Sequence, residues 1–209
     1  MQADFNLPVL AIDTSTSFLS LALRANGRTL VRHNEVGNRQ SELILPQTGE
    51  LFAEAGIGAA DLGAIVYAQG PGAFTGLRIG IGVAQGLAAP FVTPLIGVPC
   101  LDAAAYRLPG RPCVLAATDA RMGEVFYAWF DTVNRRRLSP YRVGRAAEIS
   151  VPEGTVFSDG IGKTGRLKNP VSARAARTDE TLRKFVIILA YPYRGQHQIY
   201  FADRFGKDL

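Results

Sequence analysis

The chain has 209 residues and a mass of 22.5 kDa, with 47% hydrophobic and 20% charged residues. This balance is typical of a folded protein of one or two domains and excludes disordered, collagen-like and disulfide-scaffold classes. The two cysteines, Cys100 and Cys113, form no CxxC pair, so the sequence predicts neither a disulfide framework nor a thiolate metal site. With no signal-like start and no apolar run of about 20 residues, we expect a cytoplasmic protein without a membrane span.

The net charge of +5 is divided unevenly along the chain. Residues 1–100 hold five Arg and seven acidic residues, whereas residues 101–209 hold eighteen basic and eleven acidic residues. Much of the excess lies between Arg135 and Lys184. Such a segment is suited to nucleic acid binding through counterion release. A solvated surface is the favoured interpretation, because aromatic residues are not interleaved with the basic ones.

The first 110 residues predict a mixed α/β unit that opens with a β-meander. Asn26-Gly27 is typical of the two-residue turn of a β-hairpin. Ser41 is placed to cap the first helix, and Gly56 is placed to end it. The expected elements are strands at 9–12, 19–23 and 28–31, a helix at 41–55, a strand at 64–68, a helix at about 75–89, a strand at 94–98 and a helix at 101–106.

A second unit, expected over residues 111–209, begins in the same way. A strand at 114–118 ends at Asp119, a tight turn follows, and another strand runs over 124–130. The first strand of the chain ends in the same manner at Asp13, 106 residues earlier. Internal repetition is the favoured explanation of this pattern.

Several motifs for hydrolytic and nucleotide chemistry fail on their spacing. The GKT run at 162–164 has Phe157 where a P-loop needs its first glycine. The glycines within 80–86 miss the dinucleotide fingerprint by one residue and lie in a predicted helix. The two histidines are 164 residues apart and no HExxH or GxSxG occurs, which counts against a zinc protease and removes the usual hydrolase elbow. A Cys–His pair built from residues distant in the sequence stays open.

The turn Asp13-Thr14-Ser15-Thr16 is the first of two candidate sites. An acidic residue at a strand end, followed by a hydroxyl-rich turn, is suited to hold nucleotide phosphates and their Mg²⁺. The candidate nucleotide-binding residues are Asp13, Ser15 and Thr16, with Asp119 as the corresponding acid of the second unit. The alternative is an Asx or ST turn that satisfies its own backbone. Both interpretations stay open, and the lack of a glycine in the turn makes close approach to a phosphate harder.

The second candidate site is a helix surface. Gly72, Gly76 and Gly80 recur every four residues and leave one helix face bare, so that another backbone can approach closely. We expect this face to contact a second helix, either within the fold or between subunits. If the contact joins subunits, Gly80→Leu disrupts association; if it lies inside the domain, the same substitution lowers stability directly.

Four stretches of the chain together resemble the TsaB (YeaZ) family. They are Ile12–Thr16, Arg39–Pro46, Gly70–Gly80 and Asp119–Tyr127, and the resemblance extends over about residues 8–163. The Gly-Pro-Gly run and the Asp-Ala-Arg-Met-Gly-Glu run within them are highly specific. The resemblance implies an α/β, actin-like (ASKHA) fold of two related subdomains, each opening with a β-hairpin or meander, with the completeness of the second left open.

The resemblance also implies a role in making threonylcarbamoyladenosine at the adenosine 3′ to the anticodon of tRNAs that read codons beginning with A. It implies a non-catalytic paralogue of the transferase TsaD that forms a heterodimer with TsaD, works with TsaE, forms a homodimer when alone and meets tRNA through the complex. No metal and no cofactor of its own are implied, and ATP with Mg²⁺ is expected only at an interface of the complex. The alternative function is an actin-like ATPase or phosphotransferase that uses Asp13 and Asp119. The residues implied in the partner interface are Ser41, Leu43, Leu51, Phe52, Gly72, Gly76, Arg78, Gly80 and Val83.

Two features depart from the family pattern. Gln40 stands where many relatives have His. From about residue 163 the family's usual ending is not recognisable, because all four lysines lie at or after Lys163 and six of the nineteen aromatic residues lie within 179–209. We expect an atypical tail there, with a hairpin over 185–201.

Overall fold

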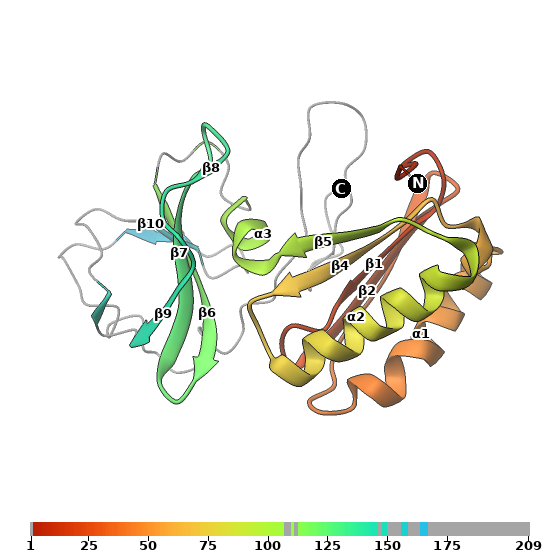
Figure 1. Ribbon diagram of the computed structural model, residues 1–209, viewed down its shortest axis with the longest axis horizontal. Helices are drawn as coiled ribbons and strands as arrows, with labels where there is room; N and C mark the ends of the chain where they lie inside the picture. Colours follow the sequence, from red (N-terminus) through yellow and green to blue (C-terminus); the bar gives the residue numbers. More distant parts are fainter. Residues whose placement is uncertain are drawn as a thin grey trace. The chain divides into compact units, whose positions relative to one another are not determined.

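The computed structural model describes residues 2–106, 110, 113–145, 148–149, 156–158 and 164–166. The chain divides into two compact units, of which the first holds the described residues up to Cys100 and the second those from Leu101 onward. Each unit has its own main sheet (Figure 1). No helix in these ranges is long and apolar enough to cross a membrane. The tail hairpin expected over 185–201 lies outside the described residues.

The first unit is built on a sheet of β1 (Val9–Asp13), β2 (Phe18–Ala25), β3 (Arg28–Glu35), β4 (Ala64–Gly70) and β5 (Leu95–Pro99). The spatial order of these five strands is β3-β2-β1-β4-β5. The antiparallel meander of β1, β2 and β3 is confirmed, and its turn at Asn26 and Gly27 has φ values of 53° and 73°. β4 and β5 then extend the sheet in parallel with β1.

Two α-helices, α1 (Gln40–Ala55) and α2 (Phe74–Ala88), lie side by side on one face of this sheet (Figure 1). Each is followed by a 3₁₀ turn, at Ala59–Asp61 and Ala89–Phe91. α2 is the crossover that parallel strands such as β4 and β5 require. The core between the helices and the sheet includes Leu10, Ile12, Leu19, Leu21, Leu23, Ile44, Leu51, Ile65 and Ala84.

The start of α1 differs from the expectation. Ser41 is not the N-cap: Arg39 occupies that position without a side-chain cap hydrogen bond, and Ser41 lies exposed in the first turn. The helix begins one residue earlier because the buried Gln40 side chain is tied to the turn after β1, where its Nε2 donates to the carbonyl oxygen of Thr16 at 3.0 Å. At the other end, Gly56 stops the helix in the left-handed conformation, as predicted.

The second unit combines a short helix with an antiparallel sheet. Leu101 and Ala105 of this helix, α3 (Cys100–Tyr106), pack against Phe130 in the sheet. The elements of the sheet are β6 (Val114–Arg121), β7 (Glu124–Asp131), β8 (Arg136–Arg137) and β9 (Arg142–Arg145), and β10 (Val156–Ser158) with β11 (Thr164–Arg166) forms a separate pair. β6, β8 and β9 all pair with β7.

The hairpin of β6 and β7 differs from the meander of the first unit. β1 ends at Asp13 and a four-residue loop precedes β2, whereas β6 continues past Asp119 to Arg121. β6 continues because its pairing with β7 persists to Arg121, and Met122-Gly123 then closes a two-residue turn with φ values of 53° and 79°. The strand end expected at Asp119 is therefore wrong, and the two acidic residues occupy different places in their hairpins.

Candidate functional site

The turn after β1 is held by its own hydrogen bonds. Asp13 Oδ1 accepts the N–H of Ser15 at 2.8 Å, and Thr16 Oγ1 accepts the N–H of Phe18 at 3.1 Å. These contacts are an Asx turn and an ST turn, the second of the two interpretations that the sequence left open. Asp13, Thr14 and Ser15 are all buried, so solvent does not reach the first three residues of the turn.

Burial controls the charge of the carboxyl group at this turn. Desolvation raises the pKa of Asp13 from 3.8 to about 6, although the hydrogen bond from the Ser15 N–H acts in the opposite direction. The Ser15 hydroxyl is itself buried and meets no partner at hydrogen-bond geometry among the described residues. At neutral pH the Asp13 carboxylate is ionised at a cost in free energy.

The N-terminal turn of α2 closes over the same residues. Thr14 Oγ1 donates a hydrogen bond to the carbonyl oxygen of Gly76 at 2.7 Å. The N–H of Ala73, the residue before α2, donates to the carbonyl oxygen of Ser15, also at 2.7 Å. The Thr14 hydroxyl and the Ser15 carbonyl oxygen are thus bonded to the start of α2.

The glycine face of α2 has an internal partner. A Cβ atom on Gly76 would lie 2.1 Å from the carbonyl oxygen of Thr14, and one on Gly80 would lie 2.3 Å from Thr14 Oγ1. Gly72 lies in the loop before α2 and not on the helix face expected for it, and a Cβ atom there would lie 2.6 Å from the carbonyl oxygen of Ser15. These glycines admit the turn after β1 and not a second helix. Their assignment to a partner interface is wrong, because the close approach that they permit is already used inside the first unit.

The packing of α2 on Thr14 and Ser15 leaves little room for a nucleotide phosphate beside these two residues. A phosphate needs free backbone N–H groups and room beside them, whereas α2 packs directly on Thr14 and Ser15. Asp119 lies half-buried inside β6, opposite Val125, and belongs to the other unit. In the described part of the chain, no group of three or more His, Cys, Asp and Glu side chains is placed to hold a metal ion.

The outer faces of α1 and α2 form the candidate partner surface. Leu51 does not belong to it, because its side chain is fully buried in the core of the first unit and is closed to a partner. The other expected residues of these helices lie at or near the surface: Ser41 and Arg78 are exposed, and Leu43, Phe52 and Val83 are half-buried at the rim of the core.

This surface also carries two large apolar side chains that the sequence did not single out. Leu45 on α1 is 55% exposed, and Phe74 at the start of α2 is 67% exposed. The Arg78 guanidinium lies 3.6 Å from the centre of the Phe74 ring, as in a cation–π contact. The sequence held a signal for Leu45, which lies four residues after Ser41 and so on the same side of the helix.

Three further glycines leave open space on these helices. A Cβ atom on Gly49, Gly82 or Gly86 would meet no atom within 4 Å, apart from the backbone of its own helix. Gly82 and Gly86 have the same four-residue spacing as the internal glycines but lie on the exposed side of α2. The helix therefore has two glycine faces, and the second one is open to a partner.

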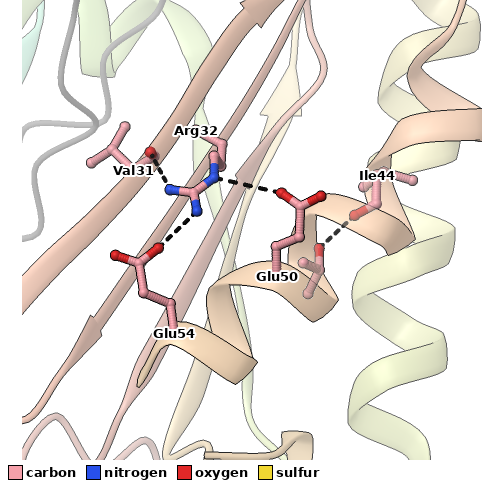
Figure 2. Close-up of polar contacts among 6 residues, drawn as sticks. Val31, Arg32, Ile44, Glu50 and Glu54 are labelled. Carbon is pink, nitrogen blue, oxygen red and sulfur yellow. Dashed lines mark hydrogen bonds and ion pairs between the residues drawn. The ribbon is translucent and has the colours of Figure 1, made fainter. Parts of the chain in front are cut away.

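An ionic contact fixes α1 against the edge of the sheet. Arg32 Nη2 lies 2.7 Å from Glu54 Oε2, and Arg32 Nε lies 3.8 Å from Glu50 Oε2 (Figure 2). Arg32 Nη1 also donates to the carbonyl oxygen of Val31 at 3.1 Å. Arg32 lies opposite Leu21 in the strand pairing and so on the helix side of the sheet, which sets the position of α1 over β3.

A family model and curated relatives identify the protein family of this chain. The model described as "TsaD: tRNA N6-adenosine threonylcarbamoyltransferase" matches residues 34–172, well over half of the chain. The chain belongs to this family. The TsaB protein of Escherichia coli (strain K12) is 46% identical over 124 residues, which are 57% of this chain and 53% of that protein. TsaB of Haemophilus influenzae is 42% identical over 127 residues, which are 59% of this chain and 53% of that protein.

A solved structure places the chain in the TsaB (YeaZ) group of the family. YeaZ from Pseudomonas aeruginosa is 37% identical with a TM-score of 0.61, and the match covers 69% of this chain and 70% of that one. The resemblance to TsaB and the α/β, actin-like fold class are thereby confirmed. This TsaB-family chain spans about half the length of the curated relatives it matches.

Proposed function

We propose that this chain is a non-catalytic accessory subunit for threonylcarbamoylation of the adenosine 3′ to the anticodon in tRNAs that read codons beginning with A. It acts in the cytoplasm by binding the transferase TsaD as a heterodimer, together with TsaE, and it meets tRNA through this complex. When TsaD is absent it pairs with a second copy of itself. Family membership and the TsaB relatives, named for tRNA threonylcarbamoyladenosine biosynthesis, support this pathway.

The outer face of α1 and α2 carries the proposal. Leu45 and Phe74 expose large apolar side chains there, and Gly82 and Gly86 leave room for the backbone of a facing helix. Exposed apolar groups beside small residues favour close packing of helices between subunits. The partner therefore docks on the outer side of these helices, and the inner glycines hold the helix in place.

The closed turn at Asp13 supports a role without turnover. Actin-like phosphotransfer with Asp13 and Asp119 as metal-orienting acids has weaker support, because Thr14 and Ser15 are bonded to α2 and buried. The proposed subunit needs no cofactor of its own, and ATP with Mg²⁺ is expected only at an interface of the complex. Mg²⁺-dependent ATP hydrolysis by the pure chain, abolished by Asp13→Ala, would favour the phosphotransferase instead.

Reconstituted tRNA modification tests the proposal. The reaction contains unmodified tRNA, TsaD, TsaE and the synthase that makes threonylcarbamoyl-adenylate, with and without this chain. We expect modification to depend on the chain and to be lost with Leu45→Glu. Leu7→Glu is the matched control, since Leu7 is 49% exposed against 55% for Leu45 but lies outside α1 and α2. Full modification without the chain refutes the accessory role, and equal activity of the two variants refutes the docking face.

A further inference from the structure

The edge of the sheet in the second unit gathers a group of arginines. β8 and β9 follow each other along the same side of β7, with Arg137 opposite Phe130 and Arg142 opposite Tyr127. Among the described strands, neither β8 nor β9 has a second neighbour, so together they form an edge. The group, named here the arginine edge, consists of Arg135, Arg136, Arg137, Arg142 and Arg145, all of them exposed.

Acidic side chains near this edge compensate part of its positive charge and leave Arg142 without an ion-pair partner among the described residues. Asp131 is buried and binds Arg136 at 3.3 Å, and hydrogen bonds led by those from Asn134 lower the pKa of its carboxyl. The other acids around the sheet edge are Asp102, which accepts the hydroxyl of Tyr141, Glu124, which faces Arg145 across the strands, and the exposed Glu148.

An aromatic ring lies within the group, contrary to the expectation from the sequence. The Arg137 guanidinium lies 4.1 Å from the centre of the Tyr141 ring. Burial and the contact with Asp102 raise the pKa of Tyr141, so the hydroxyl remains a donor at neutral pH. Tyr141 lies in the connection between β8 and β9, four residues after Arg137, and composition alone did not indicate their contact.

We propose that the arginine edge is a docking strip for the phosphate backbone of RNA, with tRNA as the occupant; this inference rests on the proposed function. The guanidinium group is a planar fork of donors that matches phosphate oxygens two at a time. A guanidinium held over Tyr141 keeps its outer face open for stacking on an unpaired base. The bland alternative is that these charges only protect an open strand edge from pairing with other chains.

Matched charge variants of the full chain test the strip. The test variant is Arg142→Gln with Arg145→Gln, and the control is Arg28→Gln with Arg39→Gln, which removes the same charge from exposed positions of the first unit. Binding of fluorescein-labelled unmodified tRNA is followed from 50 to 300 mM NaCl. Counterion release predicts that loss of two phosphate contacts lowers the slope of log Kd against log[salt] by about 1.5.

We expect the test variant to bind tRNA about tenfold more weakly than the unaltered chain at low salt. The Kd of the control variant is expected to change by less than about twofold. A third variant, Arg142→Lys with Arg145→Lys, keeps both charges and is expected to keep the salt slope. Equal binding by test and control, or no tRNA binding by the unaltered chain at 50 mM NaCl, overturns the strip. Loss of TsaD association with unchanged tRNA binding makes the edge a protein contact and also overturns it. Aggregation with unchanged tRNA binding identifies edge protection instead. Reconstituted modification that still depends on the chain shows that the proposed function survives any of these results.

Discussion

The Thr14 side-chain hydroxyl donates a 2.7 Å hydrogen bond to the carbonyl oxygen of Gly76, 62 residues further along the chain. The bond joins the turn after β1 to the first turn of α2. It forms because Gly76 has no side chain, so the helix backbone lies directly on the turn. The same contact leaves the opposite side of α2, with Gly82 and Gly86, at the surface.

Gly76→Ala is expected to destabilise the chain by about 3 kcal/mol, since the new Cβ atom would lie 2.1 Å from the Thr14 carbonyl oxygen and force the backbones apart. Gly82→Ala in the same helix is the matched control. Its Cβ atom meets open space, and alanine favours the helix by up to about 1 kcal/mol. Urea unfolding of both variants measures the difference. Similar midpoints for the two variants would contradict the internal role of Gly76.

Two leucine variants separate the inner from the outer face of α2. Gly80→Leu is expected to lower the melting temperature, because its side chain would collide with Thr14 inside the unit. Gly82→Leu is expected to leave the melting temperature within a few degrees while weakening association with TsaD or with a second copy by tenfold or more. Thermal melting and light scattering measure both properties. Unimpaired association of Gly82→Leu places the partner elsewhere.

The Asp13 carboxyl is expected to make stability depend on pH between about 4 and 6. Its pKa is raised in the folded state, so the folded chain binds more protons than the unfolded chain in this range, and stability falls as pH rises. Asn resembles the protonated acid and does not ionise, so the Asn variant avoids the loss of stability that comes with ionisation of Asp13. Asp13→Asn should therefore match the unaltered chain near pH 4 and be more stable above pH 6, by up to about 3 kcal/mol. A constant difference at all pH values would show that the carboxyl does not titrate in this window.

Arg32→Gln is expected to lower stability by about 1 kcal/mol, since it removes contacts with Glu50 and Glu54 that are only partly shielded from solvent. Arg39→Gln is the control, because Arg39 and Glu42 form a fully surface pair with 64% of each side chain exposed. We expect no measurable change for it. A double-mutant cycle with Glu54→Gln isolates the coupling, and coupling near zero would mean that packing alone holds α1 on β3.

Local patterns were sufficient to predict most elements of the first unit. Asn26-Gly27 predicted the hairpin between β2 and β3, because Asn and Gly are the residues that most readily adopt positive φ at both turn positions. Gly56 predicted the end of α1, because glycine readily adopts the left-handed conformation that ends a helix. The start of α1 was wrong at Ser41, because a contact between Gln40 and Thr16 across 24 residues decided where the helix begins.

The sequence by itself therefore determined the family motifs, the strand and helix pattern, and the existence of a bare glycine face on α2. Periodicity of four residues shows which side of a helix is bare, but it does not show what lies against that side. Only the tertiary structure decided that Thr14 and Ser15 fill the space beside Gly72, Gly76 and Gly80. The same holds for Leu51, which is buried in the core between the helices and the sheet. Which groups meet depends on contacts between distant segments, and these are fixed only when the sheet and its helices pack together.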